Sequence, residues 1–476
     1  MNLEDQIRNL TALVDRQNKQ IEWLRNRVND LEKENKELRV RLNQDSHNSS
    51  KPPSSDSIFR KSERPSRKNK NKRKPGGQSG HKGNKMTKFA IADFKQDHQL
   101  ECCPCCQSKD IEVVKMLCKQ VLDIPIPKIE VTEHQLYEYQ CQKCGQQIRN
   151  PLANELKQEV QYGPNIKSLV NYLSVYQLIP YKRLTELIEV MCGHKISQGS
   201  ISNFNKELSV KLTSFMAQLK TVFTNPDQVI HVDETGCMVS KVLHWMHVYS
   251  TKTKTLLQGH NKRGKQAMDH IGILDKAQGT VIHDRFCSYN SYNQLAHGLC
   301  NAHLIRELKS IEENQQLKWS TDIKKLLLRA KDFKDNNQLS KARAKRLQDK
   351  YEALLREQRP YYQKIEKQLK GKQSKRGRTK RSTDHNLFNA LWKYRTQILK
   401  FMYNANVPFD NNQAERDLRM LKVKMKVSNQ FKTDTWMNVH ATIRSFISTA
   451  QKQNRNIIDC ILQVHQNPVF ASQLGV

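Results

Sequence analysis

The sequence predicts a multidomain α+β protein: an N-terminal coiled coil, a zinc ribbon, a helix-turn-helix-like helical region, and a mixed α/β core with a helical insertion. Three observations predict it. The N-terminus carries an almost unbroken heptad pattern, two tight cysteine pairs follow, and short β-branched runs then alternate with helical patterns. The 476 residues, 37% of them hydrophobic, suffice for more than one core.

The charge of the chain favours a polyanionic partner. Lys and Arg number 81 against 47 Asp and Glu, a net charge of +34, which favours nucleic acid. An anionic membrane is the weaker candidate, because the basic clusters lie on no amphipathic helix with an aromatic face. The chain has no long apolar run, and its N-terminus, MNLEDQIRNL, lacks a secretory pattern. We therefore expect a soluble, cytoplasmic protein.

Residues 1–46 are predicted to form a coiled-coil oligomerisation helix. An apolar residue recurs at heptad spacing with two polar interruptions, and a buried Asn at such a position can set register and oligomer state. We expect self-association; one long helix packed on its own protein is the alternative. The core positions are Leu3, Ile7, Leu10, Val14, Gln17, Ile21, Leu24, Val28, Leu31, Asn35, Leu38 and Leu42.

Residues 47–95 are predicted to form a disordered basic linker. The segment HNSSKPPSSD (47–56) stops any helix, and the Lys- and Arg-rich chain after it ends in KPGGQSGHKG. Such an arm can neutralise phosphates without reading sequence. A solvated linker is the alternative.

Residues 96–160 are predicted to form a zinc-ribbon domain. ECCPCC (101–106) and CQKCG (141–145) can supply four thiolates to a structural Zn²⁺. The predicted ligands are Cys103, Cys106, Cys141 and Cys144, because Pro104 then follows the first ligand. Cys102 with Cys105 is the other register, and reduced free thiols are the alternative to zinc. A hairpin is expected between the pairs, around residues 121–140.

Residues 161–222 read as three short helices, over 164–177, 180–193 and 197–208. Pro164 and Pro180 suit first turns, Gly193 suits a stop, and Ser197 can cap the third helix. A helix-turn-helix that binds DNA is one interpretation, and a plain helical subdomain is the other.

Residues 223–320 are predicted to be the first part of the catalytic core. Strands are expected over 229–236, 241–250, 253–260, 279–286 and 298–303, with helices over 262–274 and 303–319. We expect the order β-β-β-α-β-α-β-α and a mixed sheet flanked by helices.

Two carboxylates occupy matching places in this core. Asp233 follows the apolar run VIHV, and Asp284 follows TVIH. Sites in open α/β sheets gather at strand ends, and an acid that is nearly buried there needs a partner. Converging carboxylates form a hard anionic pocket suited to Mg²⁺ or Mn²⁺.

A third carboxylate lies in PFDNNQAERDLRMLKVK (408–424). Asp410 or Asn411 can cap a helix beginning near Asn412, which places Glu415 in the first turn. Glu415 would complete a divalent-metal site with Asp233 and Asp284. Glu307 is its main rival, and a surface charge or helix cap is the plain alternative for each acid.

Seven cations near these acids are predicted to contact DNA phosphates. The segment GHNKRGKQ (259–266) resembles a nucleotide-binding loop, but Gln266 replaces the Ser or Thr and no β-α-β unit surrounds it, so ATP binding is not expected. His303 is interpreted as a structural histidine, with a ligand or base role as the alternative. The predicted DNA-binding residues are Lys262, Arg263, Lys265, Arg416, Arg419, Lys422 and Lys424.

The remaining chain is predicted to be helical. Residues 321–404 are predicted to form a basic insertion that includes a phosphate-binding loop, KGKQSKRGRTKR (370–381). Residues 405–476 are predicted to return to the core with amphipathic helices.

The motifs quoted above resemble those of the large transposase of the insertion sequence 66 family of bacterial mobile elements. The resemblance covers nearly the whole chain. It includes NSSKPPSSD, the paired cysteines, YGPNIKSLVNYL, HVDETG, AMDHIGIL, LCNAHLIREL and PFDNNQAERDLRMLKVKMKVS.

The resemblance implies a ribonuclease H-like core of the DDE type, with Asp233, Asp284 and Glu415 as catalytic triad. It implies two-metal cleavage and joining of DNA strands, with the element ends and target DNA as partners, two small accessory proteins of the same element, and a bacterial, nucleoid-associated location. A metal-dependent nuclease that never joins strands, or a catalytically idle zinc-ribbon regulator, would share parts of this sequence.

Overall fold

The computed structural model describes residues 3–42, 86–125, 127–150, 156, 158–371 and 381–475. Most of the predicted basic linker and of the basic loop at 370–381 lies outside these residues. The chain divides into two compact units, one of Met1–Asp56, Gln135–Leu187 and Lys195–Val476, the other of Ser57–His134 and Ile188–His194. No helix in the described parts of the chain has the length and hydropathy needed to cross a membrane.

The predicted N-terminal helix is confirmed as α1, Leu3–Leu42. Its apolar side chains face solvent: Ile7 is 57% exposed and Leu24 is 47% exposed. The apolar stripe of this helix is not covered by other described residues of the chain. A helix with such a stripe is typically stabilised by packing it against a partner. Self-association remains the prediction for this segment.

The region around the second cysteine pair is a short antiparallel hairpin of β1 (Glu138–Gln140) and β2 (Gln147–Arg149). The hairpin predicted around residues 121–140 is therefore wrong in position. Residues 121–125 and 127–137 form no strand. Pro125 and Pro127 lack the N–H groups that a strand ladder needs.

The helices predicted over 161–222 are confirmed, with a fourth that was not predicted. They are α2 (Pro164–Asn171), which continues as a π-helical turn (Tyr172–Tyr176), α3 (Tyr181–Cys192), α4 (Gln198–Lys211) and α5 (Thr213–Phe223). Ser197 caps α4, since its Oγ accepts a hydrogen bond from the Ser200 N–H at 3.0 Å. Leu208, Phe215 and Leu219 share a buried cluster with residues of the sheet. α4 and α5 are thus packed on the core.

The core is a five-stranded mixed sheet in the order β5-β4-β3-β6-β7. Its elements are β3 (Val229–Val239), β4 (Val242–Ser250), β5 (Thr255–His260), α6 (Lys265–Ile271), β6 (Thr280–His283), β7 (Ala296–Leu299) and α7 (Asn301–Gln315). The pairs β3–β4 and β4–β5 are antiparallel, and β3–β6 and β6–β7 are parallel. A 3₁₀ turn, Cys287–Ser291, replaces the helix expected between β6 and β7.

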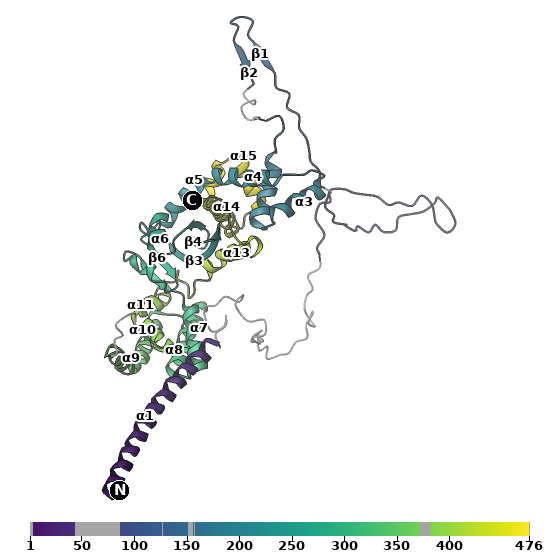
Figure 1. Ribbon diagram of the computed structural model, residues 1–476. Helices are drawn as coiled ribbons and strands as arrows, with labels where there is room; N and C mark the ends of the chain where they lie inside the picture. The colour runs from purple at the N-terminus through teal and green to yellow at the C-terminus, as the bar shows by residue number, and fades with distance from the viewer. Residues whose placement is uncertain are drawn as a thin grey trace. The chain divides into compact units, whose positions relative to one another are not determined.

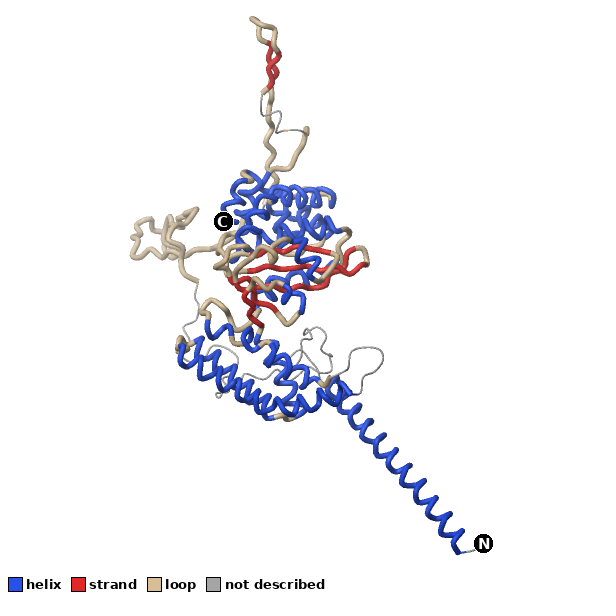
Figure 2. The backbone as a smooth tube through the Cα atoms, turned by 90° about the vertical axis from the view of Figure 1, so that its left-hand side faces the viewer, coloured by secondary structure: helices blue, strands red, loops and turns tan. Residues whose placement is uncertain are grey.

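Helices cover both sides of this sheet (Figure 2). On one side, Ile230 and Val232 pack with Val439 and Phe446 of α14 (Asp434–Lys452). On the other side, Cys237 and Val239 pack with α13 (Asn412–Ser428). Because side chains alternate along a strand, α13 covers the side of β3 that carries Asp233.

The predicted insertion is helical and shares a hydrophobic cluster with the core, which includes Ile282 and Leu299 of the sheet and Leu304 and Leu308 of α7. Its helices gather beside α7 (Figure 1). They are α8 (Lys318–Asp335), α9 (Lys341–Gly371), α10 (Thr383–Lys393), α11 (Arg395–Ile398) and α12 (Lys400–Tyr403). After α14 the chain ends in α15 (Ile457–Gln466) and α16 (Val469–Gly475).

Candidate active site

The register of the parallel strands brings the first two predicted acids to one level. His231 of β3 pairs with Ile282 of β6, so continuing two residues along both strands places Asp233 level with Asp284. His283 pairs with Leu299 of β7, so Cys300 is the next residue in the same row. Asp233, Asp284 and Cys300 therefore occupy neighbouring positions in one row across the sheet.

Asp233 lies within β3, which continues three residues beyond the predicted strand end at residue 236. Residues up to Val239 continue the strand and pair with β4. The turn between them is Ser240–Lys241, with φ of 46° and 68°. Two positive φ values suit the tight turn of a twisted hairpin, but Ser and Lys do not announce such a turn as Asn-Gly would.

The environment of Asp233 is strongly anionic. Burial, followed by the carboxylates of Glu234 and Asp284, raises the pKa of Asp233 to about 7, and Glu415 contributes in the same direction. The Glu234 N–H donates to Asp233 Oδ1 at 2.9 Å. A carboxylate surrounded by other carboxylates is stabilised in its charged form by a cation.

Asp284 follows β6 directly, and the Phe286 N–H donates to its Oδ1 at 2.8 Å. The preceding residue, His283, is buried, and burial with neighbouring His297 lowers its pKa to about 3. The two imidazoles lie 3.0 Å apart, Nε2 to Nδ1. The neutral, hydrogen-bonded pair of His283 and His297 thus fixes the backbone immediately before Asp284.

Asn411 fixes the start of α13 against the sheet. Its Nδ2 donates to the Val232 carbonyl at 2.8 Å, and its Oδ1 lies 2.9 Å from His231 Nδ1. Its backbone N–H donates to Cys300 Sγ at 3.2 Å. Asn411 occupies the cap position, but Asp410 accepts the hydrogen bond from the Asn412 N–H, at 3.1 Å. The sequence predicted a helix cap at Asp410 or Asn411 but not the contacts of Asn411 with β3.

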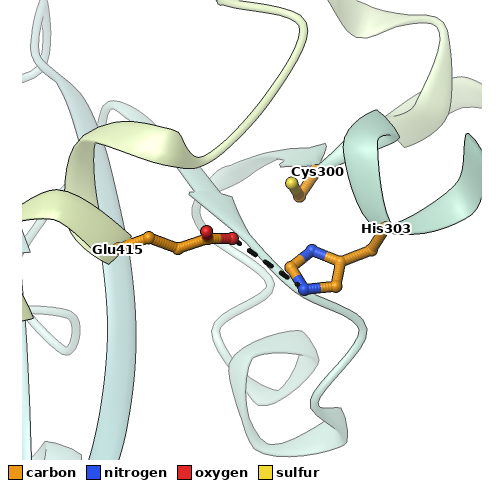
Figure 3. A group of neighbouring side chains, drawn as sticks. All are labelled: Cys300, His303 and Glu415. Atoms are coloured by element: carbon orange, nitrogen blue, oxygen red, sulfur yellow. Dashed lines mark ion pairs between the residues drawn. The ribbon is translucent and has the colours of Figure 1, made fainter. Parts of the chain in front are cut away.

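Glu415 lies in the first turn of α13, as predicted. Its Oε1 is buried and has no hydrogen-bond partner among the described residues. His303 Nε2 lies 3.9 Å from this oxygen, and burial lowers the pKa of His303. Cys300, His303 and Glu415 bring their ligand atoms within 4.8 Å of one another (Figure 3). Asp233 and Asp284 are not members of that group.

Glu307, the rival third acid, is engaged elsewhere. Its Oε1 forms an ion pair with Arg285 Nη2. An acid held by an arginine is less available as a metal ligand than one with a buried, unpartnered oxygen.

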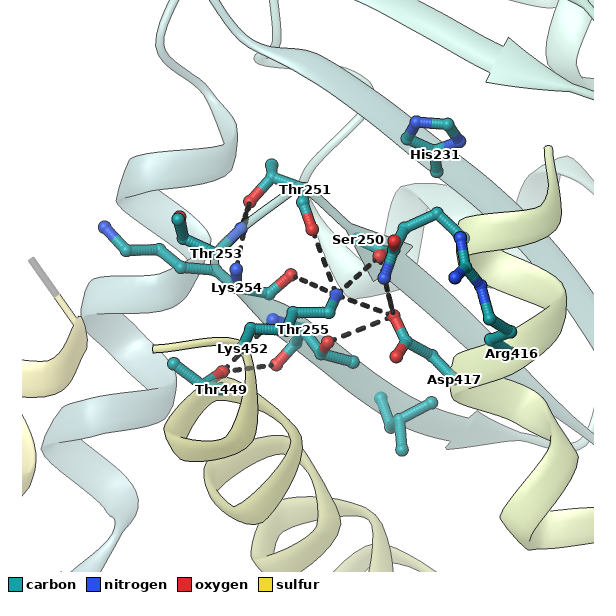
Figure 4. A network of polar contacts seen from close by, with 12 residues as sticks. His231, Ser250, Thr251, Thr253, Lys254, Thr255, Arg416, Asp417, Thr449 and Lys452 are labelled. Atoms are coloured by element: carbon teal, nitrogen blue, oxygen red, sulfur yellow. Dashed lines mark hydrogen bonds and ion pairs between the residues drawn. The ribbon is translucent and has the colours of Figure 1, made fainter. Parts of the chain in front are cut away.

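A second acid of α13, Asp417, has a carboxylate oxygen that accepts several hydrogen bonds from buried side chains. Its Oδ2 accepts from Lys452 Nζ at 2.7 Å, Ser250 Oγ at 2.6 Å and Thr255 Oγ1 at 3.1 Å. Lys452 also donates to Ser250 Oγ and to the carbonyls of Thr251 and Lys254 (Figure 4). The side chains of Asp417 and Lys452 are 10% and 11% exposed. This buried network joins α13 and α14 to β4 and β5.

The cations predicted in the loop after β5 have different environments. Arg263 Nε donates to buried Glu234 at 2.8 Å, and its guanidinium covers the rings of Trp245 and Phe286. Lys265 pairs with Asp269 at 2.7 Å. Lys262 is exposed.

The cations predicted on α13 also differ in how exposed they are. Arg416, Arg419 and Lys422 are exposed. Lys424 is half-buried, donates to Ser428 Oγ at 2.9 Å, and has its pKa lowered by burial. The exposed members follow one another along the helix and present a row of positive charge.

The two cysteine pairs form turns with the same hydrogen bonds. The Cys103 N–H donates to the Ser108 carbonyl and the Gln107 N–H to the Cys103 carbonyl; the Cys141 N–H donates to Gln146 and the Gly145 N–H to Cys141. Gln107 and Gly145, at matching places, both have positive φ. Backbone hydrogen bonds, from Cys106 and Cys105 in the first turn and from Cys144 and Lys143 in the second, lower the pKa of Cys103 and of Cys141.

Comparison with known proteins gives three family matches. Residues 101–145 match the zinc-finger binding domain of transposase IS66, and residues 3–87 match a family of unknown function. A search of curated proteins gave no match. Residues 159–438, more than half of the chain, match the transposase IS66 family with its DDE catalytic domain. The chain therefore belongs to the IS66 family of DDE transposases, which implies that it acts in DNA transposition.

Proposed function

We propose that Asp233, Asp284 and Glu415 are the catalytic carboxylates that this transposase uses to cleave and join DNA strands at the ends of its element. One observation carries the assignment of Glu415: its buried Oε1 has no hydrogen-bond partner in the described chain, on a helix that covers the Asp233 side of β3. The raised pKa of Asp233 supports the grouping, because Asp284 and Glu415 both contribute to it.

These residues fit the divalent metal ions that a DDE domain implies. Three carboxylates supply the oxygen ligands that Mg²⁺ and Mn²⁺ prefer, and their mutual repulsion favours a bound cation. When bound, two such ions would provide Lewis acidity at the attacking and the leaving oxygen of the phosphodiester.

The surrounding residues of the protein hold the three carboxylates in position. Asn411 ties the first turn of α13 to β3, the His283–His297 pair anchors the approach to Asp284, and the buried Asp417–Lys452 pair holds the next turn of α13. Fixed ligands need little rearrangement as charge develops on the phosphate. The exposed cations Lys262, Arg416, Arg419 and Lys422 would contact the DNA backbone outside the acids.

The decisive experiment uses DNA that carries the element's own end, with Mg²⁺ or Mn²⁺ and the purified full chain. We expect nicking at the end and joining of the 3′ end to target DNA, both lost in Asp284→Asn while DNA binding persists. Cleavage without joining would make the protein a nuclease. Cleavage that survives Asp284→Asn would refute the assignment.

We also propose that Cys103 and Cys106, with Cys141 and Cys144, supply the thiolates for the zinc that the zinc-finger match suggests. The support is the shared hydrogen-bond pattern, which begins at Cys103 and at Cys141. Loss of zinc from Cys103→Ser, with retention in Cys102→Ser, is expected by metal analysis. The reverse result would select the other register.

We propose that α1 pairs with α1 of a second copy, because its apolar positions are exposed at heptad spacing. Light scattering should give a smaller assembly for a chain that begins at Lys51 than for the full chain. Equal numbers of chains per assembly would contradict this.

A further inference from the structure

Cys300, His303 and Glu415 bring three different kinds of metal ligand to one place. The thiol comes from the end of β7, the imidazole from the first turn of α7 and the carboxylate from the first turn of α13 (Figure 3). Their ligand atoms lie within 4.8 Å of one another, and His303 Nε2 is 3.9 Å from Glu415 Oε1.

Polar atoms at this place lack protein partners. His303 Nδ1 and Glu415 Oε1 are buried, and neither makes a hydrogen bond to any described residue. Leaving a buried polar atom unsatisfied typically costs about 1–3 kcal/mol. Two such atoms in adjacent side chains are available to bind a ligand.

Cys300 is set up as a ligand as well. It is 2% exposed and occupies the cap position of α7. Its Sγ accepts hydrogen bonds from the backbone N–H groups of Asn411 and His303. The cysteine turns of the zinc finger also aim backbone N–H groups at Cys103 and Cys141. Burial nevertheless raises the pKa of Cys300 to about 11, whereas the pKa values of Cys103 and Cys141 are lowered, so a cation bound here must displace the proton of the Cys300 thiol.

The donor set selects a class of cation. Sulfur and imidazole nitrogen suit Zn²⁺ and Co²⁺, whereas Mg²⁺ requires oxygen ligands. Ligand atoms of a tetrahedral zinc lie roughly 3.4–3.8 Å apart, from the bond lengths of zinc to nitrogen, oxygen and sulfur. The observed group needs to close by roughly 1.4 Å at most to reach this spacing, and the fourth position would remain open.

We propose that Cys300, His303 and Glu415 form a second metal site, specific for a thiophilic divalent cation of the Zn²⁺ type. Occupation of this site takes Glu415 out of the group with Asp233 and Asp284, so the cation inhibits cleavage supported by Mg²⁺. Only this consequence for cleavage rests on the proposed function; the binding site stands on the geometry of the three ligands.

Binding is tested with Co²⁺, which reports thiolate ligation by a charge-transfer absorption band. Co²⁺ is titrated into the full chain with its zinc retained, and Cys300→Ser is compared with the wild type and with Cys460→Ser. Cys460 is a buried cysteine of α15, 3% exposed, and serves as the matched control. Serine keeps an acceptor for the Asn411 N–H. We expect one added equivalent of Co²⁺ to give a band in the wild type. The band should be absent in Cys300→Ser and should persist in Cys460→Ser.

His303→Gln is the second variant, since it leaves every cysteine in place and keeps the test valid if Cys300→Ser fails to fold. It should also weaken Co²⁺ binding at least tenfold. A band unchanged in both variants belongs to the zinc finger and would overturn the proposal.

The consequence for catalysis is tested by adding Zn²⁺ to the cleavage reaction at fixed Mg²⁺, with each protein compared to its own zinc-free rate. Half-inhibition of Cys300→Ser should need at least tenfold more Zn²⁺ than that of the wild type. Equal sensitivity would overturn the inhibitory role. If the wild type cleaves no DNA at all, the proposed function fails, while the Co²⁺ titration still decides the binding site.

Discussion

Glu415 and Asp417 lie two residues apart in α13, yet their surroundings differ completely. The Oδ2 of Asp417 accepts hydrogen bonds from Lys452, Ser250 and Thr255. The buried Oε1 of Glu415 has no such partner within the described residues. The side chain of Glu415 is 34% exposed and that of Asp417 is 10% exposed, but both acids carry a buried oxygen, so charge alone does not separate them. What separates a structural acid from a candidate ligand is whether the protein already satisfies its oxygens.

Glu415→Gln should give the largest effect. Gln keeps the size and the helix but loses the charge that a metal ligand needs, so cleavage should fall by about 10⁴-fold, as when one member of a catalytic set is removed. A strand-cleavage assay with end-labelled DNA measures this, with DNA binding followed in parallel.

Glu307→Gln is the matched control for that substitution. Its carboxylate is paired with Arg285, so cleavage should change far less. A large loss in Glu307→Gln with activity retained in Glu415→Gln would reverse the roles of the two acids.

Asp417→Asn should show the opposite behaviour, a loss of stability. The ammonium of Lys452 would remain buried without its counterion, which typically costs 3–5 kcal/mol. Lys452 keeps its bonds to Ser250 and two carbonyls, so we expect about 3 kcal/mol in the free energy of unfolding, measured by urea denaturation.

The control for Asp417→Asn is Asp349→Asn, which breaks an exposed pair with Lys345 on α9. An exposed pair contributes less than about 1 kcal/mol. If both variants lose the same stability, the Asp417 network is not the structural anchor that its burial indicates.

The sequence predicted those parts of the fold whose signals are local. β-branched runs marked β3 and β6, heptads marked α1, and the helix start near Asn412 placed Glu415 correctly. The environments that separate Glu415 from Asp417 depend on partners distant in the chain, such as Lys452 and Ser250. No local pattern encodes these contacts, because they exist only once β4, β5 and α14 have come together.

The same reason explains the misjudged details. The continuation of β3 past residue 236 depends on a turn at Ser240–Lys241 that has no Asn-Gly signature. Arg263 reads as an ordinary DNA-binding cation until the sheet brings Glu234 to it. The register of the cysteine pairs stayed open in the sequence, since Cys102–Cys105 and Cys103–Cys106 have the same spacing.

Asn411→Ala should give an intermediate effect, because Asn411 supports Glu415 without facing the phosphate itself. The substitution removes the bonds to the Val232 carbonyl and to His231, so α13 loses its fixed distance from Asp233. Loss of an outer partner of a metal ligand typically costs 10–100-fold in activity or metal affinity, and cleavage should fall in that range.

Asn412→Ala is the control for Asn411→Ala, since the Asn412 backbone makes the contacts with Asp410 and Arg416 and a change of its side chain leaves them intact. The rate of cleavage at increasing Mn²⁺ distinguishes positioning from simple unfolding. A positioning defect should be partly rescued by high Mn²⁺. A loss of activity that follows the unfolded fraction alone would argue against the positioning role.

Glu234→Gln should have the smallest effect on cleavage. It tests on β3 the same comparison between an acid held by protein partners and a candidate metal ligand. Glu234 and Asp233 are adjacent, but Glu234 is held by Arg263 and Tyr289, as Asp417 is held by Lys452. Gln can still accept the hydrogen bond from Arg263 through its carbonyl oxygen, and its amide N–H can donate to the Tyr289 hydroxyl. The free energy of unfolding should therefore fall by only about 1–2 kcal/mol, and cleavage should stay within tenfold of the wild type. Asp233→Asn, measured beside it, should reduce cleavage about as much as Glu415→Gln does, with little change in stability. If Glu234→Gln instead removes cleavage while the protein remains folded, Glu234 acts in the reaction, and satisfied oxygens no longer identify a structural acid.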